Sequence, residues 1–165
     1  IAFIGLYTLT KSNGDIQHEY GIMFDAGSTG SRIHVYKFHR DSNNNLILDD
    51  ELFEQVKPGL SSYPDDIPGA VASIQHLVDS AKAYMDEEDY AKTPLALKAS
   101  AGLRILGEEK SKPILEAVGK TLAESGFKQV WEPEIMGGDK EAVYSWVTLN
   151  YLAKVLVVWG CDFLA

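Results

Sequence analysis

The sequence has a single cysteine, Cys161, among 165 residues. One cysteine excludes a disulfide within the chain and leaves the redox compartment undetermined, so we interpret Cys161 as a buried or incidental thiol. The sequence also has no Asn-x-Ser/Thr acceptor for glycosylation, and no internal repeat or low-complexity tract. Glycosylation signals therefore do not indicate a compartment, and no repeat architecture is predicted.

Positive charge is scarce, because 15 Lys and Arg residues face 24 Asp and Glu residues and leave a net charge of −9. This balance argues against nucleic acid as a partner, since binding to its backbone needs a basic surface. If the ligand is a polyphosphate, the acidic surface requires a local cationic or metal-filled site to hold it. The hydrophobic fraction of 45% is typical of one soluble globular domain.

The apolar run at the start of the chain, residues 1–9, is too short to cross a bilayer. It is either the downstream end of a signal or signal-anchor segment or a first buried strand. The chain does not begin with Met, which indicates a fragment or a processed product. A polar spacer follows, and we assign residues 1–16 to an N-terminal segment. Residues 153–165 form an apolar tail, either a buried strand whose partner lies outside the chain or a tail foreign to the fold.

Residues 20–36 are the stretch around which the rest of the chain is organised. An apolar run ends at Asp25, a turn of small and hydroxylated residues follows, and a run rich in β-branched and aromatic residues leaves it, which predicts strand, loop, strand. Gly27 and Gly30 let backbone N–H groups approach an anion, and the hydroxyl groups between and after them add donors. An ordinary Gly/Ser hairpin is the alternative interpretation.

The order of the other elements predicts a sheet with helices laid on it. We expect strands at 19–25, 31–38 and 52–56 as a meander, the first of them covered on both faces because its centre, 22–24, is continuously apolar. An ordered loop at 57–64 leads into a helix that starts near Asp66 and Pro68 and carries an apolar stripe to Tyr84. The acidic run 86–89 is expected to be solvated surface at or beyond the end of this helix.

The second half of the chain is expected to continue the same alternation. A strand at 93–100 runs into a turn at 101–104, a second helix covers 110–125, and a short strand begins at 127. Arg104 either contacts phosphate or is a surface residue after a tight turn. A turn at 135–139 opens a third helix, in whose first turn Glu141 is either a general base or a simple N-terminal acid.

Three blocks then appear together in one order and spacing: FDAGSTGSR at 24–32, KASAGLRIL at 98–106 and IMGGDKEAVYSW at 135–146. With them the chain resembles the apyrase family, the nucleoside triphosphate diphosphohydrolases. Two further segments, VKPGLS at 56–61 and TPL at 93–95, are most similar to the soluble or Golgi and endoplasmic-reticulum nucleoside diphosphatase branch. The resemblance covers about residues 20–152, and we assign residues 17–152 to an N-terminal apyrase lobe.

The resemblance implies an α/β fold, a ribonuclease-H-like lobe of the actin-like ATPase superfold with a mixed sheet, an antiparallel meander and flanking helices. In the family, two such lobes clamp a nucleotide and a divalent metal, Ca²⁺ or Mg²⁺. Here the second lobe is expected to be missing, because the later family blocks would lie beyond Ala165.

The resemblance also implies roles for single residues. Asp25 would organise the water shell of the metal, Glu141 would take a proton from the attacking water, and Arg104 would lie near the attacked phosphoryl group. The remaining phosphate-binding residues would be Ser28, Thr29, Gly30, Ser31, Arg32, His34, Ser100 and Ala101. His34 has a structural alternative, since it alternates with Arg32 and Tyr36 on one strand face. Ala142 stands where the family usually has glycine after the glutamate.

The implied reaction is hydrolysis of a nucleoside diphosphate such as UDP or GDP to the monophosphate and phosphate, with nucleoside triphosphate as a further substrate. We expect little or no turnover from the isolated chain. Two other functions stay open: a non-catalytic nucleotide-binding or interaction fragment, and an exopolyphosphatase-like phosphohydrolase. The implied location is the lumen of the secretory pathway or the outside of the cell, with an N-terminal membrane anchor as an option.

Overall fold

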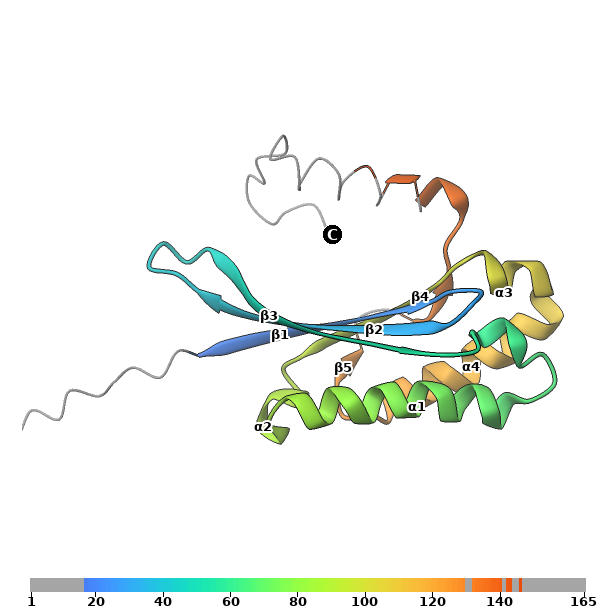
Figure 1. Ribbon diagram of the computed structural model, residues 1–165, viewed down its shortest axis with the longest axis horizontal. Helices are drawn as coiled ribbons and strands as arrows, with labels where there is room; N and C mark the ends of the chain where they lie inside the picture. The colour runs from blue at the N-terminus through green and yellow to red at the C-terminus, as the bar shows by residue number, and fades with distance from the viewer. Residues whose placement is uncertain (1–16, 130–131, 141, 144–145, 147–165) are drawn as a thin grey trace, which may run out of the picture.

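The computed structural model describes residues 17–129, 132–140, 142–143 and 146 (Figure 1). Both end segments assigned from the sequence, 1–16 and 153–165, and most of the third helix lie outside these residues, as does Glu141. Within the described part, no helix is both long and apolar enough to cross a membrane.

A six-stranded mixed sheet forms the centre of the molecule, with strand order β3-β2-β1-β4-β5 and β6 also paired with β4. The first three strands are antiparallel neighbours, whereas β4 is parallel to β1, β5 and β6. The strands are β1 (His18–Ala26), β2 (Ser31–Arg40), β3 (Leu46–Val56), β4 (Pro94–Ala99), β5 (Lys128–Gln129) and β6 (Glu134–Ile135). This arrangement confirms the predicted mixed sheet with an antiparallel meander.

Helices α1 (Ile67–Tyr84) and α4 (Glu108–Ala123) cover one face of the sheet and pack on each other (Figure 1). Helix α1 starts where the sequence predicts, because the Asp66 carboxylate accepts a hydrogen bond from the Gly69 N–H over 3.0 Å. The buried side of α1 consists of Ala70, Ile74, Leu77, Val78 and Ala81. These side chains meet Phe24, Ile33 and Leu97 from the sheet in one core.

The expectation that the first strand is covered on both faces is wrong for the described part of the chain. Successive residues of a strand point to opposite faces. Ile22 and Phe24 therefore enter the core, with exposed fractions of 5% and 1%, while Met23 lies on the other face and is 37% exposed. A run of three apolar residues gives two residues to one face and only one to the other, so it does not establish cover on both.

Several element boundaries also differ from the predictions, and residues 101–104, expected as a turn, begin a short helix, α3 (Ala101–Leu106). Strand β3 begins at Leu46, because the β2–β3 hairpin continues past a bulge between Lys37 and Phe38. The acidic run forms its own short helix, α2 (Glu87–Tyr90), although most of it is exposed as expected. Strand β6 includes Ile135, which the sequence assigned to a turn, because its backbone pairs with Ala99.

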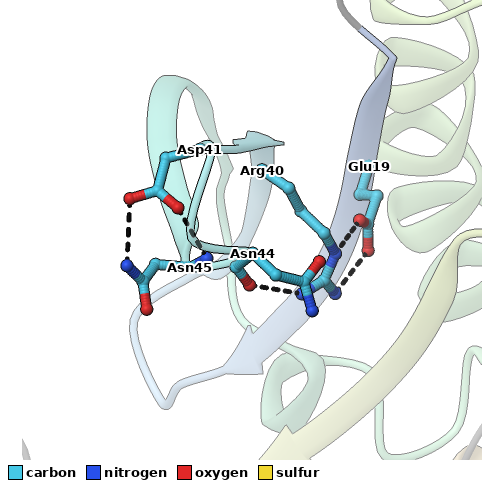
Figure 2. A network of polar contacts seen from close by, with 5 residues as sticks. All are labelled: Glu19, Arg40, Asp41, Asn44 and Asn45. Carbon is cyan, nitrogen blue, oxygen red and sulfur yellow. Dashed lines mark hydrogen bonds and ion pairs between the residues drawn. The ribbon is translucent and has the colours of Figure 1, made fainter.

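The turn between β2 and β3 is built on one carboxylate (Figure 2). Asp41 accepts hydrogen bonds from the N–H groups of Asn43 and Asn45, both 2.8 Å, and from the Asn45 side chain over 2.9 Å. These bonds hold the pKa of Asp41 below its usual value, the Asn45 side-chain bond contributing most. Arg40 joins the turn to β1 through two bonds to Glu19, of 2.5 and 3.1 Å.

Strand β3 is an edge of the sheet and carries a row of carboxylates, Asp49, Asp50, Glu51 and Glu54. All four histidines of the chain pair with this strand. The pairs are His18 with Asp49, His34 with Glu51, His39 with Asp49 and His76 with Glu54. Imidazole rings from three neighbouring elements thus contact the acidic edge.

Candidate active site

The loop of residues 27–30 joins β1 to β2 as a tight turn. The Gly27 N–H donates to the Gly30 carbonyl over 3.1 Å, and the strands pair up to Ala26 and Ser31 on either side. Both glycines are buried, whereas Ser28 and Thr29 at the tip are exposed. The turn is therefore closed by its own backbone and presents two hydroxyl groups to solvent.

Ser31 differs from the serine and threonine of the loop tip. Its side chain is 1% exposed, and its Oγ is the buried side-chain polar atom that has no hydrogen-bond partner in the described part of the chain. A buried hydroxyl without a partner costs free energy, so such groups are expected where a ligand or ordered water completes the bonding. Ser31 lies at the end of this turn, on the face of β2 that also carries the buried Ile33 and Val35.

Asp25 and Arg32 occupy facing positions on β1 and β2, at the ends of the strands that the loop connects. The Arg32 Nη1 donates to Asp25 Oδ2 over 3.0 Å, and the Asp25 side chain is 46% exposed. No group of three or more metal-ligating side chains is present among the described residues. One accessible carboxylate fits a metal held largely by water and by substrate oxygens, the usual manner of Mg²⁺ at phosphates.

His34 lies two residues beyond Arg32 on the same face of β2, but its contacts are with β3 and with its own strand. The Nδ1 atom is 2.5 Å from Glu51 Oε1, and the ring stacks on Tyr36 with 5.8 Å between centroids. Phe53 is a third ring in this group, 5.0 Å from His34. These contacts are compatible with the structural alternative that the sequence left open for His34.

The second block meets the loop at the end of β4. The Ser100 N–H donates to the Ala26 carbonyl over 3.1 Å, and α3 (Ala101–Leu106) begins directly after it. At Gly102, a Cβ atom would lie 2.7 Å from the Ser28 Cα, so the first turn of α3 rests on the loop. The segment that starts at Ser100 is thus a neighbour of the loop.

The third block is joined to the second by backbone and side-chain bonds. The Met136 N–H donates to the Ala99 carbonyl over 2.8 Å, and Arg104 Nη1 donates to the Met136 carbonyl over 2.9 Å. Arg104 is otherwise exposed. The structure therefore brings the described parts of the three blocks together, while the position of Glu141 lies outside the described residues.

Sequence reasoning missed one segment of this site, the short helix η1 (Leu60–Ser62) and the glycine before it. At Gly59, a Cβ atom would lie 2.2 Å from the Gly27 carbonyl oxygen, and Ser61 Oγ lies 3.4 Å from the Ser28 carbonyl oxygen. The sequence indicates an ordered loop at 57–64 and a likeness of 56–61 to one branch of the family, but not the contact with residues 27–30. Its sequence, with glycine and two serines beside a proline, resembles an ordinary loop.

Two cavities lie away from the loop. One of about 410 Å³ lies between α4 and residues 132–135, and one of about 330 Å³ lies near the starts of β1 and β4. Neither is lined by residues 27–32. Neither cavity is therefore part of the site at this loop.

Comparison with known proteins decides the family. Residues 11–156 match the model of the GDA1/CD39 (nucleoside phosphatase) family. The chain belongs to this family. The apyrase resemblance that the three blocks indicate is thereby confirmed.

Several characterised members of the GDA1/CD39 family are similar in sequence to this chain. Guanosine-diphosphatase of Saccharomyces cerevisiae is 46% identical over 139 residues, which are 82% of this chain and 27% of the yeast protein. Human nucleoside diphosphate phosphatase ENTPD5 is 44% identical over 83% of this chain and 32% of its own length. These names agree with the diphosphatase branch, and the chain spans about a third or less of these relatives.

Solved structures agree on the fold. Nucleoside triphosphate hydrolase from Neospora caninum matches 84% of this chain and 32% of its own chain with a TM-score of 0.59 at 15% identity. A PPX-GPPA enzyme of Aquifex aeolicus matches 84% of this chain and 42% of its own with a TM-score of 0.53 at 13% identity. Together with the observed sheet, these matches confirm the predicted ribonuclease-H-like lobe of the actin-like ATPase superfold.

A charged row crosses the sheet beside the GDA1/CD39 motifs. Lys98 faces Asp25 in the β1–β4 pairing, and its Nζ is 2.7 Å from Glu134 Oε1 on β6. Lys140, which precedes Glu141 in the chain, reaches the same oxygen at 3.4 Å. The hydrogen bond from Lys98, assisted by Lys140, lowers the pKa of Glu134. Glu134 therefore stays ionised at neutral pH and ties the third block to the strand beside Asp25.

Proposed function

We propose that this chain forms the phosphate-holding lobe of an enzyme that hydrolyses nucleoside diphosphates to the monophosphate and phosphate. The proposal rests on one observation. The first two family blocks meet at Ser28, because Gly102 of the second block packs against this residue. Relatives that are about 45% identical in sequence to this chain are named as diphosphatases, and these names support the same substrate class.

The proposed roles follow from charge and donor geometry. Ser28, Thr29, Gly30 and Ser31 would donate hydrogen bonds to the terminal phosphate, and Arg32 would add positive charge beside them. Ser100, Ala101 and Arg104 would border the attacked phosphorus. Glu141 would accept a proton from water, which displaces the nucleotide in line and leaves no phosphoenzyme. His34 would bind phosphate only if its hydrogen bond to Glu51 breaks. Phosphate binding by His34 is therefore the least supported of these roles.

A divalent cation, Ca²⁺ or Mg²⁺, is part of the proposal. Asp25 would hold it through bound water, and the cation would neutralise charge on the phosphate oxygens. The pairing of Asp25 with Arg32 supports this assignment, because a phosphate and a cation arriving together give each of these side chains a partner of opposite charge. Residues 17–152 would make up the lobe.

The proposal is tested by titrating the purified chain with GDP and UDP, with and without Mg²⁺ or Ca²⁺, by calorimetry. We expect binding that depends on the metal and is lost in Ser28→Ala. Ser42→Ala, in the turn at the opposite end of β2, is the matched control and should bind normally. Absence of binding to either diphosphate with metal present would contradict the proposal.

Phosphate release in the same mixtures separates the candidate functions. Binding with little or no turnover agrees with a lobe that lacks part of the catalytic machinery, and it is also the result expected of a non-catalytic nucleotide-binding fragment. Adding the remainder of a relative's chain in trans distinguishes these two, because only the lobe of an enzyme should gain turnover. Polyphosphate that displaces UDP at lower concentration would favour the exopolyphosphatase alternative.

We also propose a lumenal or secreted location, which rests on family membership and on the diphosphatase branch. An N-terminal anchor stays a prediction for residues outside the described part. Protease protection of the tagged protein in intact microsomes tests the location. Full digestion without detergent would contradict a lumenal site.

A further inference from the structure

Gly59 packs against the backbone of the loop at three points. A Cβ atom at this residue would lie 2.2 Å from the Gly27 carbonyl oxygen, 2.8 Å from the Ser28 carbonyl oxygen and 2.9 Å from the Gly30 nitrogen. Real Cβ atoms essentially never approach other heavy atoms closer than 3.0 Å. Any residue other than glycine would therefore have to push the loop away.

Residue 59 must be glycine because a side chain would have no room there, and not because of its backbone conformation. Gly59 has φ −74° and ψ 166°, which is extended backbone that any residue adopts. A substitution by alanine therefore causes no strain within residue 59 itself. Its effect falls on the atoms that the new methyl group would meet, and all three of those belong to the loop.

The segment after Gly59 is fixed in the core, so it is the loop that has to move. Leu60 is fully buried, with an exposed fraction of 0%, and belongs to the core under the sheet. Gly102 adds a second close approach from α3, since its Cβ would lie 2.7 Å from the Ser28 Cα and 3.0 Å from Ser61 Oγ. Ser28 is thus held between η1 and α3, two elements that contact each other.

We propose that Gly59 and Gly102 are positioning residues that set the backbone of residues 28–30 for the terminal phosphate. This inference rests on the proposed function, because it names what the loop is positioned for. The N–H groups of a loop bind an anion well only when they converge on it, so a shift of a few tenths of an ångström weakens several bonds together. Neither glycine contacts the phosphate through a side chain, so both act through the loop.

The experiment compares the chain with Gly59→Ala and Gly102→Ala, using Gly21→Ala as the matched control. Gly21 lies in β1 and has no atom within 4 Å of an added Cβ. A further control, Ile114→Val, removes a buried carbon in α4 and lowers stability without touching the loop. Thermal unfolding, amide NMR spectra, and affinity for inorganic phosphate and for GDP with Mg²⁺ are measured for each protein.

We expect both loop variants to shift the amide signals of Ser28, Thr29 and Gly30 and to bind GDP at least tenfold more weakly. Gly21→Ala should leave signals and affinity unchanged, and Ile114→Val should lower the melting temperature with normal affinity. Unchanged loop signals in folded Gly59→Ala and Gly102→Ala would overturn the proposal, as would shifted signals with normal affinity. If one variant fails to fold, the other decides, because each glycine approaches Ser28 from a different element.

The two proposals fail in distinguishable ways. If the unsubstituted chain binds neither phosphate nor GDP, the proposed function fails, while the loop signals still report whether the two glycines set its conformation. If the unsubstituted chain binds and both glycine variants bind equally well, only the positioning role is lost.

Discussion

Arg32 and Asp25 form an ion pair across the first two strands, with 3.0 Å between Nη1 and Oδ2. The pair lies at the point where the loop of residues 27–30 leaves and re-enters the sheet. Each side chain therefore neutralises the other in the free chain. A phosphate with its cation would give both of them new partners.

The role of Asp25 predicts a change in metal dependence. In Asp25→Asn we expect Mg²⁺ to lose most of its effect on GDP affinity, a loss of roughly tenfold, because a hydrogen bond to a charged group contributes about 1.5 kcal/mol or more. Calorimetry with and without Mg²⁺ measures this. Asp86→Asn is a suitable control, since Asp86 precedes α2 and its side chain makes no capping bond. Full metal dependence in Asp25→Asn would remove this residue from the site.

The unpartnered hydroxyl of Ser31 predicts opposite effects on stability and binding. Ser31→Ala removes a buried polar atom that has no hydrogen-bond partner among the described residues, so the free chain should be as stable as before or more stable by about 1 kcal/mol, while GDP affinity falls. Ser125→Ala is the contrast. Its buried Oγ donates to the Leu122 carbonyl and accepts from the Phe127 N–H, so its loss should destabilise the chain by about 1 kcal/mol. Chemical denaturation and calorimetry measure both effects, and a destabilised Ser31→Ala would contradict the prediction.

Glu134 predicts a pH-dependent contribution to stability. Its pKa is lowered from 4.5, mainly by the hydrogen bond from Lys98, so its contribution is present above pH 4.5 and is lost as the pH falls through the lowered value. Because the side chain is 39% exposed, water screens the pair and we expect about 0.5 kcal/mol at neutral pH. The melting temperatures of the chain and of Glu134→Gln should therefore differ at pH 7 and converge in acid. A difference in melting temperature that does not change with pH would exclude the ionised Glu134 carboxylate as its cause.

Asp41 predicts a second, local acid sensitivity. Its pKa lies below the usual 3.8, so the turn between β2 and β3 should be protected from amide exchange near neutral pH and should open as the carboxylate is protonated in strong acid. Asp41→Asn should expose the Asn43 and Asn45 amides at all pH values. Hydrogen exchange followed by NMR measures this, and Asp86→Asn, directly before α2, serves as a control outside the turn. Equal protection in both variants would contradict the role of Asp41.

The sequence predicted the strand, loop, strand around residues 27–30 because every local signal there agrees. Two glycines, three hydroxylated residues and an acid at a strand end lie within seven positions, and the family blocks add their order. Helix α1 was predicted equally well, since Asp66 marks its start and the apolar stripe marks its buried face. In these places local preference and the final fold require the same residues.

What the sequence did not reveal depends on contacts between distant segments. Gly59 is 31 residues from Ser28 in the chain, and only the fold shows that the two backbones touch. Lys98, Glu134 and Lys140 likewise become one charged group only when β6 pairs with β4. At Met23 the sequence predicted a contact that the described part of the fold does not contain. An apolar run does not show which neighbouring element, if any, covers each face of the strand.

The acidic edge strand β3 has a consequence for self-association. An exposed edge offers unpaired backbone groups to another chain, and natural sheets oppose such addition with charge. Asp49, Asp50, Glu51 and Glu54 place like charges where a second copy would have to add its own edge. The charge on this strand therefore makes pairing between the β3 edges of two copies unfavourable.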